Sequence, residues 1–156
     1  MRINFLILVA LGWLVVSCNP CSDVVCKNGT KEQDGRDCKC ECDEWYEGEE
    51  CNTRMTKKFE GNYVGDVNCD GSSSSNAPSN VKQSPSIDNR LVFEDGDYYG
   101  VLTSSTSFDI PKQSHPDPDI ETIRGGGSLN GSQITINAVF TSSFGGQSAC
   151  TFTGTD

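Results

Sequence analysis

Residues 21–51 read CSDVVCKNGTKEQDGRDCKCECDEWYEGEEC and hold six of the nine cysteines in this chain of 156 residues. Their bulky apolar side chains are almost limited to Val24, Val25, Trp45 and Tyr46. So small a core cannot offset the entropy of ordering the chain, so we expect the segment to fold around disulfide bonds. That requires an oxidising compartment. Six cysteines allow fifteen pairings, and their spacing alone leaves the connectivity open.

The second half of this stretch, Cys40–Cys51, has the spacing C-x-C-x-x-aromatic-x-x-G-x-x-C. This spacing resembles the end of epidermal-growth-factor-like (EGF-like) modules, and the resemblance extends back to Cys21. It implies that the first cysteine pairs with the third, the second with the fourth and the fifth with the sixth. The implied bonds are Cys21–Cys38, Cys26–Cys40 and Cys42–Cys51.

Metal binding by this module is not expected. The run Cys-x-Cys-x-Cys is poor spacing for a tetrahedral zinc site, and an exported chain favours oxidation of its thiols. Some EGF-like modules bind calcium through acidic and amide residues just before the first cysteine. Here Asn19-Pro20 supplies no carboxylate, and the third and fourth cysteines enclose only Lys39. We therefore predict no metal ion and no cofactor.

The amino terminus predicts export. Arg2 precedes the apolar run Phe5–Val16, which is too short to span a bilayer and has the length of a signal-peptide core. The run ends in Val-Val-Ser-Cys at residues 15–18, which resembles the lipobox of bacterial lipoproteins. The resemblance implies that residues 1–17 are removed and that Cys18 is acylated. The alternative is an ordinary secretory peptide, which would leave Cys18 as an unpaired thiol.

Acylation of Cys18 would anchor the protein in a membrane, which would then be its partner. Such an anchor is stable when it carries two or more acyl chains. We expect a cell-envelope location, at the outer membrane, with the periplasmic or exterior face left open. Removal of Arg2 with the signal changes the net charge from −10 to −11. So acidic a chain would repel phosphate, which excludes nucleic acid as a partner. The acidity indicates a soluble surface or attraction of cations or basic partners.

The composition changes after Cys51. Residues 52–58, NTRMTKK, predict a short linker, and residues 59–156 are rich in Ser, Thr and Gly. Apolar residues and glycines recur there with the period of two that is typical of half-buried strands, as in Phe59 to Val67 and Ile134 to Phe140. Asp95-Gly96 and Asn130-Gly131 predict hairpin turns. We expect an antiparallel meander of about seven or eight strands, with Ser72 to Asn76 as a flexible loop.

Cys69 follows the first predicted strand and Cys150 lies in the last, so we expect a bond between them. Joining first and last strands is typical of a closed barrel, although a sandwich can be pinned in the same way. The segment also resembles the lipocalin-like β-barrel domains of bacterial envelope lipoproteins, through Phe59-x-Gly61-x-Tyr63 and the GGSLNGxxITI run at 126–136. The predicted fold is mainly β, with an EGF-like module at 18–51 and an antiparallel β-barrel, or sandwich, at 59–156.

Catalytic residues are not evident. His115 is the single histidine, it lies in the Pro-rich segment 114–119, and no G-x-S-x-G motif accompanies it. Asp66, Asp70, Asp117 and Asp119 could offer oxygens to calcium but lack the spacing of a calcium loop. We therefore expect no enzyme and no metal site.

Three functional hypotheses are considered, of which an enzyme is the least favoured and the first of the other two is preferred. The first is a non-enzymatic lipoprotein that displays loops to an unidentified protein or glycan at a membrane surface. The second is a carrier with a lipocalin-like barrel that holds a small hydrophobic ligand. A packed interior and a ligand cavity look alike in sequence, so only the structure can separate them.

Overall fold

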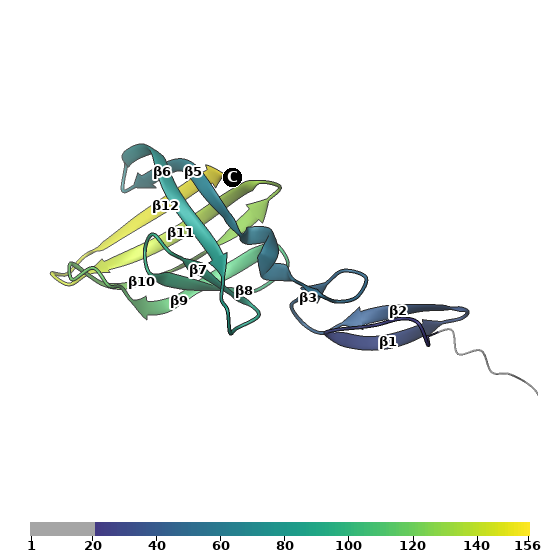
Figure 1. Ribbon diagram of the computed structural model, residues 1–156. Helices are drawn as coiled ribbons and strands as arrows, with labels where there is room; N and C mark the ends of the chain where they lie inside the picture. The colour runs from purple at the N-terminus through teal and green to yellow at the C-terminus, as the bar shows by residue number, and fades with distance from the viewer. Residues whose placement is uncertain (1–20) are drawn as a thin grey trace, which may run out of the picture.

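β-Strands form most of the computed structural model, which describes residues 21–156. The predicted signal peptide, residues 1–17, and the lipidation site Cys18 lie outside the described residues. A small disulfide-bonded unit and a larger barrel follow one another along the molecule (Figure 1).

Residues 21–54, called here the disulfide module, contain two short antiparallel ladders. Strand β1 (Gly29–Asp34) pairs with β2 (Asp37–Cys42), and β3 (Tyr46–Glu47) pairs with β4 (Thr53–Arg54). The three disulfides are Cys21–Cys38, Cys26–Cys40 and Cys42–Cys51. They are the pairs that the EGF-like resemblance implies.

Eight antiparallel strands form the barrel, each pairing with the next along the chain. The strands are β5 (Gly61–Cys69), β6 (Ser72–Gln83), β7 (Arg90–Phe93), β8 (Tyr98–Leu102), β9 (Ser107–Ser114), β10 (Ile120–Asn130), β11 (Gln133–Ser142) and β12 (Gln147–Thr155). The last strand, β12, pairs with the first, β5, which closes the sheet. The prediction of a mainly β fold is confirmed, as a closed barrel rather than a sandwich.

The closing ladder carries a covalent bond. Cys69 and Cys150 lie directly opposite each other on β5 and β12, with their Cα atoms 4.1 Å apart, and form a disulfide. The two residues are 81 positions apart in sequence. Closing so long a loop stabilises the fold by about 4 kcal/mol in the entropic model.

Alternate residues of the strands point into the barrel and form one core together with Phe59, which precedes β5. Its members are Phe59, Tyr63, Val81, Leu91, Phe93, Leu102, Phe108, Ile110, Ile123, Ile134, Ile136, Ala138 and Phe152. The expected period of two is therefore present, and it buries Tyr63 on β5 and Ile134, Ile136 and Ala138 on β11.

The serine-rich segment was predicted wrongly as a flexible loop. Ser72 to Asn76 belong to β6, and Ser72 to Ser74 pair with β5. The turn lies just before them, at Asp70-Gly71, where both residues have positive φ, 47° and 87°, as a two-residue type I′ turn requires. Because that turn sets Ser72 opposite Cys69, the serines continue the ladder, interrupted by a bulge at Asn76.

The predicted hairpins form at both expected places. Residues 94–97, including Asp95-Gly96, connect β7 to β8. The other loop is Gly131-Ser132, one position later than Asn130-Gly131, because Asn130 pairs with Gln133 in the ladder. Only Gly131 there needs positive φ, at 60°.

The predicted linker, residues 52–58, is structured. After β4 the chain forms the 3₁₀ helix η1 (Met55–Phe59), which lies at the end of the barrel where β5 begins (Figure 1). Phe59 is fully buried and packs edge-on against Phe108 with ring centroids 5.8 Å apart. The Tyr63 hydroxyl donates to the Phe59 carbonyl at 3.1 Å. This end is called the closed end.

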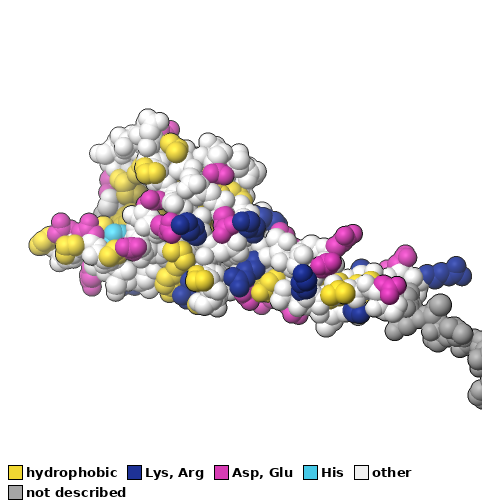
Figure 2. Space-filling model, viewed as in Figure 1, with side chains coloured by type: hydrophobic (Ala, Val, Ile, Leu, Met, Phe, Trp, Pro, Cys, Tyr) yellow, Lys and Arg dark blue, Asp and Glu magenta, His cyan; other side chains and the backbone are white. Residues whose placement is uncertain are grey.

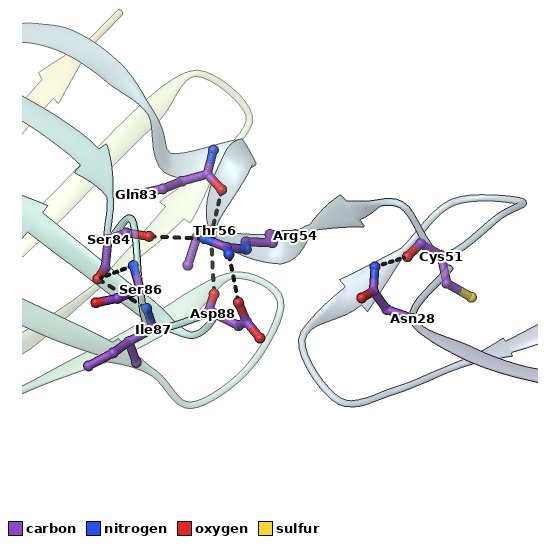
Figure 3. A network of polar contacts seen from close by, with 9 residues as sticks. All are labelled: Asn28, Cys51, Arg54, Thr56, Gln83, Ser84, Ser86, Ile87 and Asp88. Atoms are coloured by element: carbon purple, nitrogen blue, oxygen red, sulfur yellow. Dashed lines mark hydrogen bonds and ion pairs between the residues drawn. The ribbon is translucent and has the colours of Figure 1, made fainter. Parts of the chain in front are cut away.

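Polar contacts join the disulfide module to the barrel at the closed end (Figure 3). Arg54 donates to the Ser84 carbonyl at 2.9 Å, and its second terminal nitrogen lies 2.9 Å from a carboxylate oxygen of Asp88. The buried Thr56 hydroxyl lies 3.1 Å from Oε1 of Gln83 and 3.3 Å from the Asp88 carbonyl, so the two acceptors share one proton. The β6–β7 loop thus holds β4 and η1.

Apolar and backbone contacts reinforce this junction. The Met55 amide donates to the Trp45 carbonyl at 2.8 Å, and Lys58 lies 2.6 Å from Glu47. The side chains of Trp45 and Met55 pack against the barrel core. The module therefore shares part of its small core with the barrel.

We predict that Arg54→Ala loosens the junction. The variant should lower the free energy of unfolding by about 1–2 kcal/mol, because a partly buried charged donor leaves the Ser84 carbonyl and Asp88. In backbone ¹⁵N relaxation, the module should then tumble faster than the barrel. Arg36→Ala, which removes an exposed arginine from the β1–β2 turn, is the matched control. Identical relaxation and stability in the two variants would contradict this role.

Candidate functional site

The candidate site is the end of the barrel opposite η1, called here the open end. The loops around it are residues 70–71, 94–97, 115–119 and 143–146. In Figure 1 this end points away from the disulfide module. The chain order of an up-and-down barrel places these alternate connections together, because each strand reverses direction.

A cavity of ≈ 330 Å³ lies at the open end. Aromatic and aliphatic side chains form most of its wall together with the Cys69–Cys150 disulfide. These apolar members are Val67, Pro78, Phe93, Tyr98, Ile136, Ala138, Phe140 and Phe152. Polar groups enter from Ser79, Asp95 and His115. Such a volume, with an apolar wall and few polar groups, is typical of a small-molecule site.

The cavity exists because the two halves of the interior are filled differently. In the closed half, Phe59 and Phe108 occupy the axis, and Phe108 fits there only beside glycines. A Cβ at Gly127 would lie 2.5 Å from the Phe108 ring, and one at Gly100 would lie 2.9 Å from it. In the open half, inward positions carry small residues such as Ser79 and Ala138. The closed half is packed and the open half is hollow.

Two aromatic pairs flank the cavity. Tyr98 stacks on Phe93 with centroids 4.7 Å apart and an interplanar angle of 17°. Burial, and secondarily the charge of Asp95, raises the pKa of Tyr98 to about 12. His115 meets Phe140 edge-on at 6.0 Å. The Tyr98 hydroxyl is therefore shielded from water and lies within the influence of the Asp95 carboxylate.

Hydrogen bonds order the loops at the open end. Nδ1 of His115 accepts from the Asp117 amide at 3.1 Å, so a neutral ring carries its proton on Nε2. Asp117 accepts from the Asp119 amide at 2.9 Å, and the Ser143 hydroxyl donates to the Pro118 carbonyl at 2.7 Å. The cavity therefore has a defined rim.

The aspartates considered for calcium are distributed around the barrel. Asp70 accepts from the Ser148 hydroxyl at 2.6 Å and the Ala149 amide at 3.2 Å, which lowers its pKa. Asp66 is exposed on β5, away from the loop that carries Asp117 and Asp119. Among residues 21–156, no three His, Cys, Asp or Glu side chains are grouped to hold a metal ion. Nor does this part of the chain contain a helix long and apolar enough to cross a membrane.

Sequence reasoning named His115 and the two cysteines of the cavity wall, but it missed Phe93, Tyr98, Ala138 and Phe140 as members of one site. The period of two along Ile134 to Phe140 predicted that Ala138 and Phe140 share one face of a strand, but no such signal covered Tyr98. Which half of the interior each would line depends on strand register, which the sequence did not supply.

We predict that Tyr98 makes stability depend on alkaline pH. Its folded pKa lies above the ordinary value of about 10, so its contribution is complete below pH 10 and falls as the pH rises toward 12. Between about pH 9 and pH 11 the unfolding free energy should fall by about 1 kcal/mol more in the native chain than in Tyr98→Phe. Urea unfolding at both pH values measures this difference. Equal losses in the two proteins would contradict the assignment.

Comparison of the chain with protein-family models, with curated proteins and with solved structures gives no match.

Proposed function

We propose that this chain is a non-enzymatic lipoprotein of the cell envelope that binds a small apolar ligand in the open end of its barrel. The observation that carries the proposal is the apolar cavity of ≈ 330 Å³ bounded by ordered loops. It favours the carrier hypothesis over display of loops alone, because a packed barrel would present no concave apolar surface.

The size of the cavity limits the affinity. A ligand that buries about 200 Å² of apolar surface would gain about 5 kcal/mol before the cost of association is subtracted, so burial alone would give a dissociation constant no tighter than about 0.1 mM. Polar contacts to Ser79 or the Tyr98 hydroxyl would add to this value. The site thus suits reversible capture of a small ligand or of the apolar part of a larger one.

The order of the parts supports a ligand site that faces away from a membrane. The described chain begins in the disulfide module, the module meets the closed end, and the cavity lies beyond it (Figure 1). If Cys18 carries the lipid, the EGF-like module would act as a spacer next to the bilayer. Ligand exchange would then take place at the membrane-distal end.

The anchor is tested by mass spectrometry of the protein purified from a bacterial host that processes lipoproteins. We expect the chain to begin at Cys18 and to carry the mass of a diacylglyceryl group, with or without an additional acyl chain. Cys18→Ser should abolish that mass and release the protein from membranes. An unmodified Cys18 in the exported protein would overturn the anchor and leave the ligand site unaffected.

The ligand site is tested with the neutral fluorescent probe N-phenyl-1-naphthylamine. We expect saturable enhancement of its fluorescence and a rise in melting temperature, because a ligand bound only by the folded state stabilises it by mass action. Ala138→Phe should fill the cavity and weaken binding by about tenfold or more.

Val139→Phe is the matched control, because this neighbour of Ala138 faces the outside of the same strand. It should keep wild-type binding. Circular dichroism and melting temperature establish that both variants are folded. Failure of the wild-type protein to bind the probe or other small apolar molecules would overturn the proposed function.

A further inference from the structure

Acidic side chains are concentrated in the loops at the open end, and one of them, Asp95, lines the cavity together with His115. Residues 70–71, 94–97, 115–119 and 143–146 contain no Lys or Arg, and their acidic side chains are Asp70, Glu94, Asp95, Asp97, Asp117 and Asp119. Figure 2 shows magenta and yellow side chains with the cyan His115 at this end of the molecule. Among the basic residues of the adjoining strands, Lys82, Lys112 and Arg124 are exposed, and Arg90 lies over the Tyr99 ring, 4.1 Å from its centroid.

Most of these negative charges are not neutralised. Glu94 forms an ion pair with Lys82 at 2.7 Å, but the described ion pairs include none of the five aspartates of the rim. By contrast, Arg54, Lys57 and Lys58 near the closed end each have a carboxylate partner. The molecule therefore has a negative field at the open end that its own side chains do not cancel.

From this we propose that the ligand of the cavity is an amphipathic cation, a small molecule with an apolar part and an amine or quaternary ammonium group. The inference rests on the proposed function, since it names the class of ligand for the same cavity. The apolar part would occupy the space among Ala138, Phe152 and Val67, and the cationic group would lie at the rim near Asp95.

Aromatic faces add a second attraction for such a group. Phe93, Tyr98 and Phe140 line the cavity beside Asp95 and His115. The negative faces of aromatic rings attract ammonium groups, more strongly where water is excluded. Asp95 already exerts its charge on this wall, because it helps to raise the pKa of Tyr98. An anionic ligand of the same shape would meet repulsion from the same groups.

The test compares three small molecules that share an octyl group and differ in their head group: octyltrimethylammonium, 1-octanol and octyl sulfate. The measurement is the displacement of N-phenyl-1-naphthylamine from the mature protein. Each octyl compound is used below its own critical micelle concentration. At low salt we expect the cation to bind at least about threefold more tightly than the alcohol and the sulfate more weakly than both. The preference for the cation over the alcohol should shrink in about 0.5 M NaCl.

A variant protein tests whether the aspartates of the open-end loops cause the preference for the cation. The triple substitution Asp95→Asn, Asp97→Asn and Asp119→Asn keeps shape and hydrogen-bonding capacity, and Asn tolerates the positive φ of 49° at position 97. It should bring cation and alcohol to within about twofold of each other, chiefly by weakening the binding of the cation.

The control removes three charges elsewhere, through Glu41→Gln, Glu44→Gln and Glu49→Gln in the disulfide module. All three glutamates are exposed, and we expect this variant to keep the wild-type preference. Binding of the neutral probe and of octanol without preference for the cation would overturn this inference and leave the proposed function standing. Absence of binding by every probe would overturn both.

Discussion

The pairing of β12 with β5 is the constraint on which the rest of this structure depends. It satisfies the backbone groups of both edge strands and converts a meander, which would expose two sheet edges, into a barrel with an interior. The disulfide between Cys69 and Cys150 lies within that ladder and restricts the unfolded chain. The same two residues form part of the cavity wall, so closure of the sheet and formation of the proposed ligand site share one interaction.

Unequal filling of the interior follows from where the large side chains enter. Phe59 comes from η1 and Phe108 from β9, and together they occupy the closed half. Small inward residues and peripheral aromatic rings leave space in the open half. A barrel of eight strands is just wide enough to be filled by its side chains or to hold one small ligand. Here the closed half is filled with side chains and the open half contains the cavity.

The junction at η1 determines which end of the barrel faces the disulfide module. Arg54 and Thr56 bind the β6–β7 loop, and Trp45 reaches the barrel core from the disulfide module. Loops on the other end are free to carry an acidic rim, because none of them packs against the module. The negative field lies at the end of the barrel that points away from the disulfide module.

Sequence patterns alone determined the β class, the period-two core and both disulfide-bearing segments, because each depends on residue type and local spacing. The EGF-like resemblance implied the three bonds of the module. Sequence missed β6 at Ser72, since low side-chain complexity says nothing about backbone pairing, which the Asp70-Gly71 turn decided. It also treated residues 52–58 as a linker, because a 3₁₀ helix of five residues is too short to give a periodic signal. Only tertiary structure decided that the barrel closes, that one half is hollow and that acidic loops distant in sequence surround it. Those features depend on strand register and on the alternation of chain direction, which bring together residues that local sequence cannot relate.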